Sequence, residues 1–388
     1  MKIALVHDWV VTIGGAEACL EVFHELWPEA PLYTLVYAEK SVRKLGFSPP
    51  QVHASFLQRL PRAQKWYRRY LPLYPLAIEQ FDLSAYDVIL SSSHAAAKGV
   101  LTRSNQLHIC YCHTPMRYAW DLTHAYLREH GLERGLKGAL ARFFLHYLRT
   151  WDSLTANRVD YFIANSQYTA RRIWRVYRRK AMVIYPPVKV ERSEKDEKEG
   201  NNNKEDFFLF VSRMVPYKRA DLVVAAFTQL DYPLLVVGEG PQFKECRRLA
   251  GKNVKFLGFQ DNGTVRDLMA KARALVFAAE EDFGIVPVEA QAAGTPIIAY
   301  GKGGALETVV PANGENWDEA TGVFFAEQTL DALTGALRQF LQVEGNFQLA
   351  ALQKKARLFS RERFKEQVKS FLEEKMMTIE RGINKQGA

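Results

Sequence analysis

The chain has 388 residues, of which 48% are hydrophobic and 24% charged. This composition is ordinary for a globular protein, and the length allows two or three domains. This composition excludes wholesale disorder and collagen-like repeats. The sequence contains no run of about 18 uncharged apolar residues, so it predicts no membrane-spanning helix. The N-terminal MKIALVHDW lacks the features of a signal peptide, and four cysteines are too few for a disulfide framework. We therefore expect an intracellular protein with reduced thiols.

The net charge of +9 is distributed unevenly along the chain. Residues 1–190 carry a net charge of +11, whereas residues 191–388 carry −2. A basic half beside a near-neutral half indicates that one domain meets a polyanion or an anionic membrane surface, while the other has a different task.

Short apolar runs recur along the sequence and predict β-strands. Several of them are apolar without alternation, as in strands buried on both faces. Helical periodicity follows the glycine turn at Gly14 and again follows Lys218. This alternation predicts an α/β fold with open, mostly parallel sheets. The predicted strands are residues 2–9, 87–93, 107–112, 161–166, 182–187, 207–213, 233–238, 254–259, 274–280, 296–301 and 322–326.

A segment without any apolar residue divides the chain into two α/β halves. Residues 191–206 read ERSEKDEKEGNNNKED and predict a linker or a long solvated loop between a domain at 1–190 and a domain at 207–360. The tail at 361–388 begins with apolar residues on one helical face, so we expect this helix to dock on a domain.

Two turns that follow predicted strands are candidates for binding phosphate. Gly14 and Gly15 open a helix and permit close approach of an anion, although a plain glycine turn explains them equally well. Arg213 and Lys218 place two cations at one strand end, and this pair suits a diphosphate better than either residue alone.

The segment EDFGIVPVEA at 281–290 is the most informative part of the sequence. Amides at Gly284 and Ile285 would donate to a phosphate at the start of a helix. A carboxylate so close to phosphate needs sugar hydroxyls as partners, so we interpret Glu289 as a ribose ligand and Glu281 as a partner of the transferred group. The GEG turn around Glu239 suits main-chain contacts with a nucleobase.

His113 leaves a predicted strand at its carboxyl end and is a candidate for a role in a cleft, with a structural histidine as the alternative. A zinc site at 108–112 is not expected, because His108 and Cys112 would lie about 13 Å apart on an extended strand. The sequence contains no Asp-x-Asp motif, so we predict no metal cofactor.

Residues 56–75 interleave cations with aromatic and apolar side chains, a pattern that suits the interface of an anionic bilayer. We predict that this segment forms a membrane or acceptor surface through Arg59, Arg62, Lys65, Trp66, Tyr67, Arg68 and Arg69.

Together these motifs resemble a known family. The sequences SRMVPYKR, VVGEGP, FLGF and above all the spacing of Glu281 and Glu289 in EDFGIVPVE look like the E-x7-E retaining glycosyltransferases of family 4. In the first half, HDWVVTIGGAE, SSSHAAAKGV, CHTPMRYAWD, LRTWD, ANSQYTARRI and YPPV look like the bacterial branch that includes O-antigen mannosyltransferases. Lys189 departs from the pattern, because relatives often carry Asp there.

The resemblance implies a GT-B fold, in which two Rossmann-like domains face each other across a cleft. It implies that Arg213 and Lys218 hold the diphosphate of a nucleotide sugar, Glu289 its ribose, and Glu281 with the amides of Phe283, Gly284 and Ile285 the donor sugar. Gly14 and Gly15 would close on the phosphates, His113 would face the transferred sugar, and the helix at 361–388 would cross back to the first domain.

We therefore expect a metal-independent retaining hexosyltransferase at the cytoplasmic face of the membrane. The expected reaction moves mannose from GDP-mannose to a lipid-linked or cell-surface saccharide of lipopolysaccharide or other polysaccharide biosynthesis. A sugar-nucleotide epimerase or a phosphorylase-type enzyme of the same fold is one alternative. A basic nucleic-acid-binding protein is another, which the charge and Trp66 with Tyr67 favour.

Overall fold

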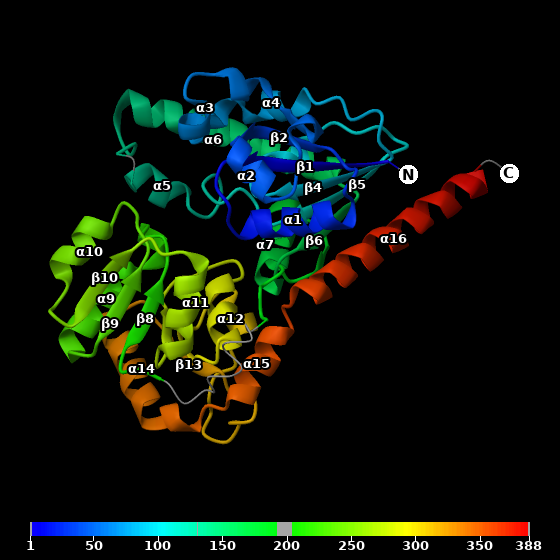
Figure 1. Cartoon of the computed structure of the whole chain (residues 1–388). Helices are drawn as coiled ribbons and strands as arrows, with labels where there is room; N and C mark the ends of the chain where they lie inside the picture. Colours follow the sequence, from blue (N-terminus) through cyan, green and yellow to red (C-terminus); the bar gives the residue numbers. More distant parts are fainter. Residues whose placement is uncertain (1, 130, 192–203, 387–388) are drawn as a thin grey trace. The chain divides into compact units, whose positions relative to one another are not determined.

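The computed structural model describes residues 2–129, 131–191 and 204–386, which form two compact units (Figure 1). Unit 1 comprises Met1–Pro187 and Phe364–Ala388, and unit 2 comprises Val188–Arg363. The chain therefore changes unit close to the two predicted boundaries at 190 and 360. Of the predicted linker at 191–206, residues 192–203 lie outside the described residues.

Unit 1 is built on a seven-stranded parallel sheet with the order β3-β2-β1-β4-β5-β6-β7. Because every strand runs the same way, all carboxyl ends lie at one edge, where ligand-binding loops of open α/β sheets are found. The strands are β1 (Ile3–Val10), β2 (Leu32–Tyr37), β3 (Val52–Ala54), β4 (Val88–Ser93), β5 (Leu107–Cys112), β6 (Tyr161–Ala164) and β7 (Ala181–Val183).

Helices cover both faces of this sheet (Figure 1). Along β1, Ala4 and Val6 pack with α3, α4 and α6, whereas Leu5 packs with α1 and α16. The helices are α1 (Gly15–Leu26), α2 (Glu39–Lys44), α3 (Ala63–Trp66), α4 (Tyr74–Glu79), α5 (Thr123–Glu129), α6 (Gly135–Thr155), α7 (Gln167–Tyr177) and α16 (Arg361–Gln386). Short 3-10 helices are η1 (Pro49–Gln51), η2 (Phe56–Arg59), η3 (Tyr67–Leu73), η4 (Ala97–Gly99) and η5 (Ala156–Arg158).

The C-terminal helix α16 packs into the core of unit 1 with the apolar face that its sequence presents. The Phe364 ring lies 5.7 Å from Phe23 and 5.6 Å from Tyr111, measured between ring centroids. Val368, Phe371 and Leu372 are buried in the same cluster. Burial of these side chains accounts for the docking that the sequence pattern leads us to expect.

Unit 2 has a six-stranded parallel sheet with the order β10-β9-β8-β11-β12-β13. Its strands are β8 (Phe208–Val211), β9 (Leu234–Val237), β10 (Val254–Gly258), β11 (Leu275–Phe277), β12 (Ile297–Tyr300) and β13 (Gly322–Phe325). One face packs on α9, α10 and α14, and the other on α11, α12 and α13. The helices are α9 (Ala220–Leu230), α10 (Phe243–Leu249), α11 (Asn262–Lys271), α12 (Ile285–Ala292), α13 (Ala305–Thr308), α14 (Leu330–Val343) and α15 (Leu349–Arg357), with η6 (Pro216–Lys218) and η7 (Glu344–Asn346).

All predicted strands are present, but the sequence prediction missed β2 and β3. β2 was identifiable from its apolar run LYTLVY, five residues of which are buried. β3 has only three residues at the sheet edge, too few to carry a hydrophobic pattern. Among the described residues, no helix is both long enough and apolar enough to span a bilayer.

Candidate active site

In unit 2 the structure brings together two residues that the sequence predicted to bind different parts of a donor. Lys218 follows β8 and Glu281 follows β11, and the Lys218 Nζ forms an ion pair with Glu281 Oε1. The two side chains are 15% and 21% exposed, so both charges remain accessible to a ligand. Arg213 at the end of β8 is exposed to solvent. The carboxyl edge of this sheet therefore presents Arg213, Lys218 and the Glu281 carboxylate.

Close packing of the backbone around Gly304 holds the loop that carries Glu281 in place. The Gly304 amide donates to the Glu281 carbonyl oxygen at 2.8 Å. A Cβ at Gly304 would lie 2.2 Å from the carbonyl oxygen of Phe283, so no larger residue fits without movement. The buried Phe283 ring packs 5.2 Å from the ring of Phe359. The sequence analysis assigned no role to Gly304 and missed this supporting contact.

Helix α12 begins directly after this loop. Gly284 is its N-cap and has a φ of +86°, a left-handed conformation that favours glycine. The free amides of the first turn then follow at Ile285, where the helix dipole favours a bound anion. This geometry agrees with a phosphate or sugar-hydroxyl role for the segment, which remains a prediction for Phe283, Gly284 and Ile285.

Glu289 lies one turn further along α12 and lines a cavity of about 150 Å³. Burial raises the pKa of its carboxyl group, and the positive charges of Arg266 and Lys189 partly oppose that rise. Arg213, Lys218 and Glu281 do not line this cavity, so their cooperation with Glu289 in one ligand site stays a prediction. The lining residues are Lys189, Glu191, Asn262, Val265, Arg266, Met269, Ala270, Glu289, Ala292 and Ala293.

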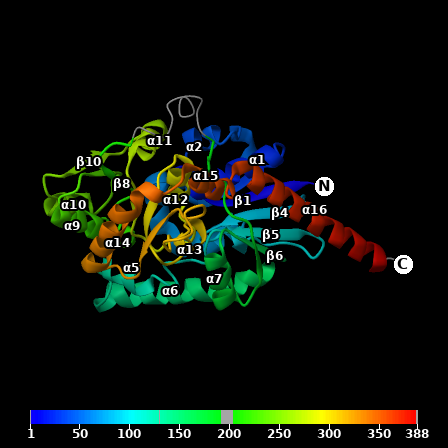
Figure 2. The ribbon, with the colours of Figure 1, turned by 90° about the horizontal axis from the view of Figure 1, so that it is seen from below.

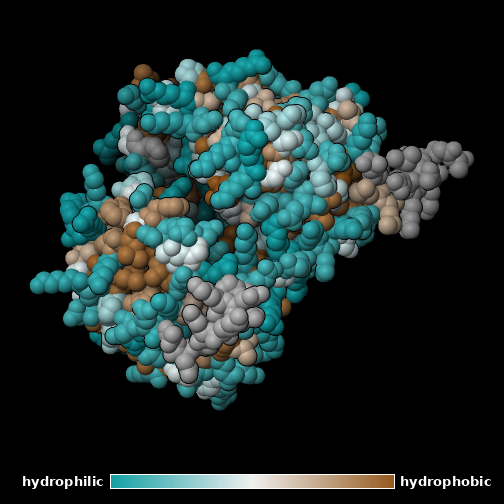
Figure 3. All heavy atoms as spheres, viewed as in Figure 1, coloured by the Kyte–Doolittle hydropathy of each residue, from teal (hydrophilic) through white to brown (hydrophobic). Residues whose placement is uncertain are grey.

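The turn around Glu239 packs against the loop that follows β8. The Met214 amide donates to the Glu239 carbonyl oxygen at 2.9 Å, and the Glu239 side chain is exposed. Figure 3 shows apolar surface over β8 to β10. At the end of β10, Phe259 is 77% exposed and Leu257 is half-buried. Main-chain groups and an exposed aromatic ring therefore lie at the ends of neighbouring strands.

In unit 1 the predicted phosphate turn is already capped by a carboxylate. The Gly14 amide donates to Glu17 Oε2 at 2.8 Å, and Glu17 Oε1 lies 3.7 Å from His7 Nε2. Burial would raise the pKa of Glu17, but its interaction with the neighbouring His7 holds this pKa below its usual value. A phosphate at Gly14 would have to displace this carboxylate, a competitor that the sequence analysis did not consider.

His113 follows β5 as predicted, but it is only 9% exposed. Its Nε2 lies 2.8 Å from Ser92 Oγ, and its carbonyl oxygen accepts a hydrogen bond from Asn165. Burial, together with the nearby His94 and His7, holds the pKa of His113 well below its usual value, so the ring is neutral. A neutral, nearly buried imidazole suits an orienting role better than a charged one.

Two groups that the sequence analysis missed lie beside His113. Asp8, in the last part of β1, is fully buried and accepts hydrogen bonds from the amides of residues 94–97. His94 Nδ1 lies 3.1 Å from Asp8 Oδ2, and the His94 side chain is 23% exposed. Both residues stood in HDW and SSSHAAAKGV, motifs that the sequence analysis quoted without assigning a role to either residue.

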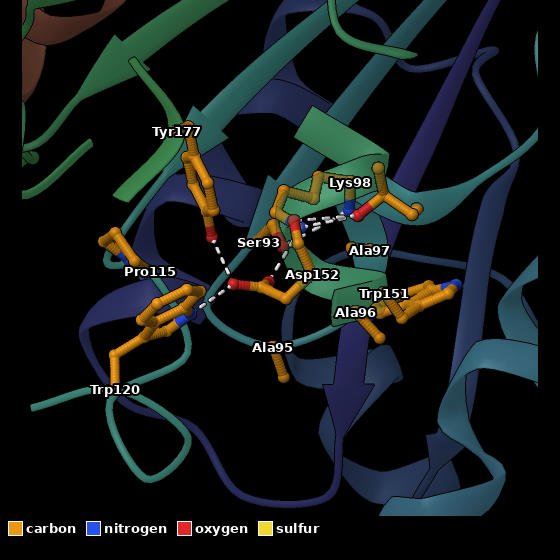
Figure 4. A network of polar contacts seen from close by, with 12 residues as sticks. Ser93, Ala95, Ala96, Ala97, Lys98, Pro115, Trp120, Trp151, Asp152 and Tyr177 are labelled. Carbon is orange, nitrogen blue, oxygen red and sulfur yellow. Dashed lines mark hydrogen bonds and ion pairs between the residues drawn. The ribbon is translucent and has the colours of Figure 1, made fainter. Parts of the chain in front are cut away.

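A second buried carboxylate anchors the loop that follows His113. Figure 4 shows Asp152 of α6 between Trp120 and Tyr177 on one side and Lys98 on the other. Trp120 Nε1 and the Tyr177 hydroxyl donate to Asp152 Oδ2 at 2.8 and 2.9 Å, and Lys98 Nζ lies 2.8 Å from Oδ1. Lys98 Nζ also donates to Thr155 Oγ1 at 2.8 Å. This network ties α6, α7, η4 and the 113–122 loop together.

The predicted membrane or acceptor surface at 56–75 is partly core. Tyr67 is 7% exposed and packs 5.1 Å from the Trp9 ring, so its prediction as a surface residue is wrong. The guanidinium carbons of Arg62 and Arg69 lie 4.9 and 5.1 Å from the centroid of the Trp66 ring, so this ring makes cation–π contacts with both. Arg59, Lys65 and Arg68 are exposed, as a surface role requires.

All four cysteines are buried, and none of them forms a disulfide among the described residues. His108 bonds to Ser91 Oγ at 2.8 Å and to the Arg158 carbonyl oxygen at 2.9 Å. Within the described parts of the chain, no cluster of three or more His, Cys, Asp or Glu side chains is placed to hold a metal ion.

Two family models match consecutive parts of the chain. The model described as "Glycosyl transferases group 1" matches residues 191–359, and "Glycosyltransferase Family 4" matches residues 13–192. The chain belongs to the family 4 type of glycosyltransferases. The O-antigen branch that the sequence suggested stays a prediction for this glycosyltransferase.

Curated relatives of this glycosyltransferase include several mannosyltransferases. A GDP-mannose-dependent monoacylated alpha-(1-6)-phosphatidylinositol monomannoside mannosyltransferase of Corynebacterium glutamicum is 40% identical over 26% of this chain and 31% of its own. An uncharacterised glycosyltransferase of Methanocaldococcus jannaschii is 30% identical over 46% and 48%. The alpha-1,3/1,6-mannosyltransferase of Mus musculus is 25% identical over 81% of each chain. The chain thus spans about half or less of the length of the first two relatives.

Solved structures place the glycosyltransferase in the GT-B fold. Anabaena HepE in complex with UDP and glucose has a TM-score of 0.67 at 20% identity, covering 96% of this chain and 99% of its own. The lipopolysaccharide outer core galactosyltransferase WaaB has a TM-score of 0.60 at 17% identity, covering 97% and 100%. The predicted fold of two Rossmann-like domains is confirmed.

Proposed function

We propose that the protein is a retaining hexosyltransferase that moves mannose from GDP-mannose to a hydroxyl group of a lipid-linked saccharide. The observation that carries this proposal is the Lys218–Glu281 ion pair at the carboxyl edge of the unit 2 sheet, next to the start of α12. A cation, a helix N-terminus and a hydroxyl acceptor side by side suit a sugar diphosphate. Mannose is favoured because relatives from Corynebacterium and mouse are mannosyltransferases.

In the proposed reaction the acceptor oxygen forms a bond to the anomeric carbon while the bond from that carbon to the diphosphate breaks. Lys218, Arg213 and the first amides of α12 stabilise the charge of the departing diphosphate. Glu281, released from Lys218 by the incoming phosphate, accepts hydrogen bonds from hydroxyl groups of the donor sugar. The acceptor proton passes to the leaving phosphate oxygen, so no side chain has to be a strong base.

Exposed Phe259 beside the main-chain groups of the Glu239 turn offers a flat contact for the nucleobase. The nucleobase of the donor needs a test of its own, because HepE was solved with UDP. Thermal unfolding with GDP, UDP and ADP discriminates among them, since a ligand that binds only the native state raises its stability. We expect the largest shift with GDP, and a larger shift with UDP would replace GDP-mannose by a UDP sugar.

The diphosphate role of Lys218 is tested by Lys218→Met, with Lys271→Met as the matched control. Lys271 pairs with Glu205 in an exposed site on the same unit, with side chains 49% and 56% exposed. We expect Lys218→Met to lose most of the nucleotide-dependent shift and to lower transfer roughly 100-fold or more, whereas Lys271→Met keeps both. Equal behaviour of the two variants would contradict this site assignment.

Transfer assays test the chemistry. We expect the product to keep the anomeric configuration of the donor by NMR, and a chelator to leave the rate unchanged if no metal takes part.

Glu289→Ala is expected to abolish transfer, whereas retained activity would remove Glu289 from the donor site. A nucleic-acid-binding protein would instead show salt-sensitive oligonucleotide binding that survives Glu289→Ala.

A further inference from the structure

Helix α6 carries an uncovered apolar stripe along its whole length. At 3.6 residues per turn its large exposed side chains share one face, while Leu145 and Leu148 on the opposite face are buried in the unit 1 core. Figure 2 shows the helix running along the outside of unit 1. The stripe consists of Leu136, Leu140, Phe143, Tyr147 and Leu154, with exposed fractions of 86, 54, 64, 42 and 63%.

The exposed charges on α6 itself are all positive. Lys137, Arg142 and Arg149 lie on the helix, and Arg134 is its N-cap. The only carboxylate of α6 is Asp152, which is buried and paired with Lys98. An apolar stripe edged by cations is typical of helices that lie in the interface of an anionic bilayer. A second copy of the same face would instead bring like charges together.

The neighbouring helix extends the same surface layer. Trp151 Nε1 of α6 donates to Glu79 Oε1 of α4 at 2.8 Å, and Leu76 of α4 is 54% exposed. The segment at 56–75 packs on the same face of the sheet as α6. Its exposed cations therefore belong to the layer that carries the stripe, although Tyr67 points into the core.

We propose that α6 is the membrane-docking element of the protein. Leu136, Leu140, Phe143, Tyr147 and Leu154 enter the headgroup and acyl boundary of an anionic bilayer, and Lys137 and Arg142 meet lipid phosphates. This assignment deepens the proposed function, on which it rests for the presence of a lipid-linked acceptor, by naming the surface that meets the membrane. It gives the apolar part of the contact to α6 and leaves residues 56–75 an electrostatic part.

Cosedimentation of the full chain with vesicles tests the apolar contact. We compare the wild type, the double variant Leu140→Ser/Phe143→Ser, and Leu249→Ser, whose side chain is 47% exposed on α10 of unit 2. On vesicles of phosphatidylcholine with phosphatidylglycerol, the double variant should bind at least roughly tenfold more weakly than the wild type. Leu249→Ser should bind like the wild type. Wild-type binding by the double variant would overturn the proposal.

The electrostatic part is tested separately. Lys137→Glu should weaken binding to the anionic vesicles about fivefold or more, because each positive charge near such a surface contributes about that factor. The wild type should bind vesicles of phosphatidylcholine alone much more weakly than anionic ones. Equal binding to both vesicle types would overturn the choice of an anionic bilayer.

Self-association and loss of folding are distinguished in the same variants. If the stripe paired two copies of the chain, light scattering would show a wild-type dimer that the double variant loses, with vesicle binding unchanged, and the proposal would fail. Because the mutated side chains are exposed, each of these variants should keep the wild-type thermal transition and its nucleotide-dependent shift. A missing shift in the wild type counts against the proposed function alone, since vesicle binding needs no nucleotide.

Discussion

The two units secure the carboxyl edges of their sheets in different ways. In unit 1 buried charges do so: Asp8 binds the amides of residues 94–97, and Asp152 pairs with Lys98 at side-chain exposures of 0% and 2%. In unit 2 the loops rest on glycine contacts between backbones, and the Lys218–Glu281 pair is 15% and 21% exposed. These charges of unit 1 are buried, whereas the Lys218–Glu281 pair of unit 2 stays within reach of a ligand.

This difference separates structural charge from binding charge. An incoming diphosphate can compete with Glu281 for Lys218, because both side chains are accessible and water already screens their attraction. Lys98 is enclosed by Asp152, Thr155 and the rings of Trp151 and Tyr177. Its charge cannot serve a ligand, so its role is to hold the surrounding elements of unit 1.

Removal of Asp152 should have the largest effect. Asp152→Ala leaves Lys98 buried without its counter-ion and removes the acceptor of Trp120 and Tyr177, so we expect unit 1 to lose about 3–5 kcal/mol of stability. Urea unfolding followed by hydrogen exchange in peptides of α6 and of the 113–122 loop measures this loss, and separates it from unit 2.

A partly exposed ion pair of unit 2 provides the matched control. Arg273 bonds to Glu344 at 2.6 Å, with side chains 20% and 33% exposed. Glu344→Ala should cost about 1 kcal/mol or less, because Arg273 can still pair with Asp206 or water. Similar losses in the two variants would remove the contrast between a buried and a partly exposed ion pair.

Acid should destabilise unit 1 through its buried histidines. Burial lowers the pKa of His108 from 6.5 to about 4, so the unfolded chain binds a proton that the native ring rejects. The contribution of His108 to the stability of unit 1 is fully present above pH 6.5. It falls as the pH drops towards 4, by about 3 kcal/mol at most. Unfolding of His108→Asn at both pH values should show a shallower acid limb.

The exposed His53 of β3 is the control for the substitution itself. His53→Asn makes the same chemical change without removing a buried ring, so it should leave the stability at pH 6.5 close to the wild-type value. Asn at position 108 can still donate to the Arg158 carbonyl oxygen, so the variant separates protonation from loss of that hydrogen bond. An unchanged acid limb in His108→Asn would show that other groups dominate.

Much of the fold and part of the site follow from local sequence patterns. Continuous apolar runs mark buried parallel strands, and the residues directly after them reach the ligand-binding edge of the sheet, as Lys218 and Glu281 do. Patterns of this kind are local, so a single sequence is enough to see them. The shared cavity of Glu289 with Arg266 and Lys189 depends on tertiary packing and was not foreseen.

Buried polar partners were also missed, for the same physical reason. Asp152 meets Lys98 and Trp120 from distant parts of the chain, and no periodicity marks such a meeting. The α6 stripe was missed differently. Its helix has apolar residues on two opposite faces, so periodicity alone cannot tell which face packs on the core.

A smaller effect than that of Asp152→Ala concerns the glycine support of the unit 2 edge. In Gly304→Ala the new Cβ would meet the backbone of Phe283, which cannot rotate away as a side chain could. We expect unit 2 to lose roughly 1–3 kcal/mol through this overpacking, and transfer to fall because the Glu281 loop shifts. The φ of Gly304 is −66°, so backbone strain of alanine does not contribute.

Gly335 in the middle of α14 shows what the same substitution does without a clash. Nothing lies within 4 Å of a Cβ placed there, and alanine forms helix better than glycine by about 1 kcal/mol. Gly335→Ala should therefore raise the stability of unit 2 by up to about that amount, whereas Gly304→Ala lowers it. Opposite signs in calorimetry would tie the cost at Gly304 to its contact with Phe283, and a neutral Gly304→Ala would mean that the accessible edge yields to an added methyl group.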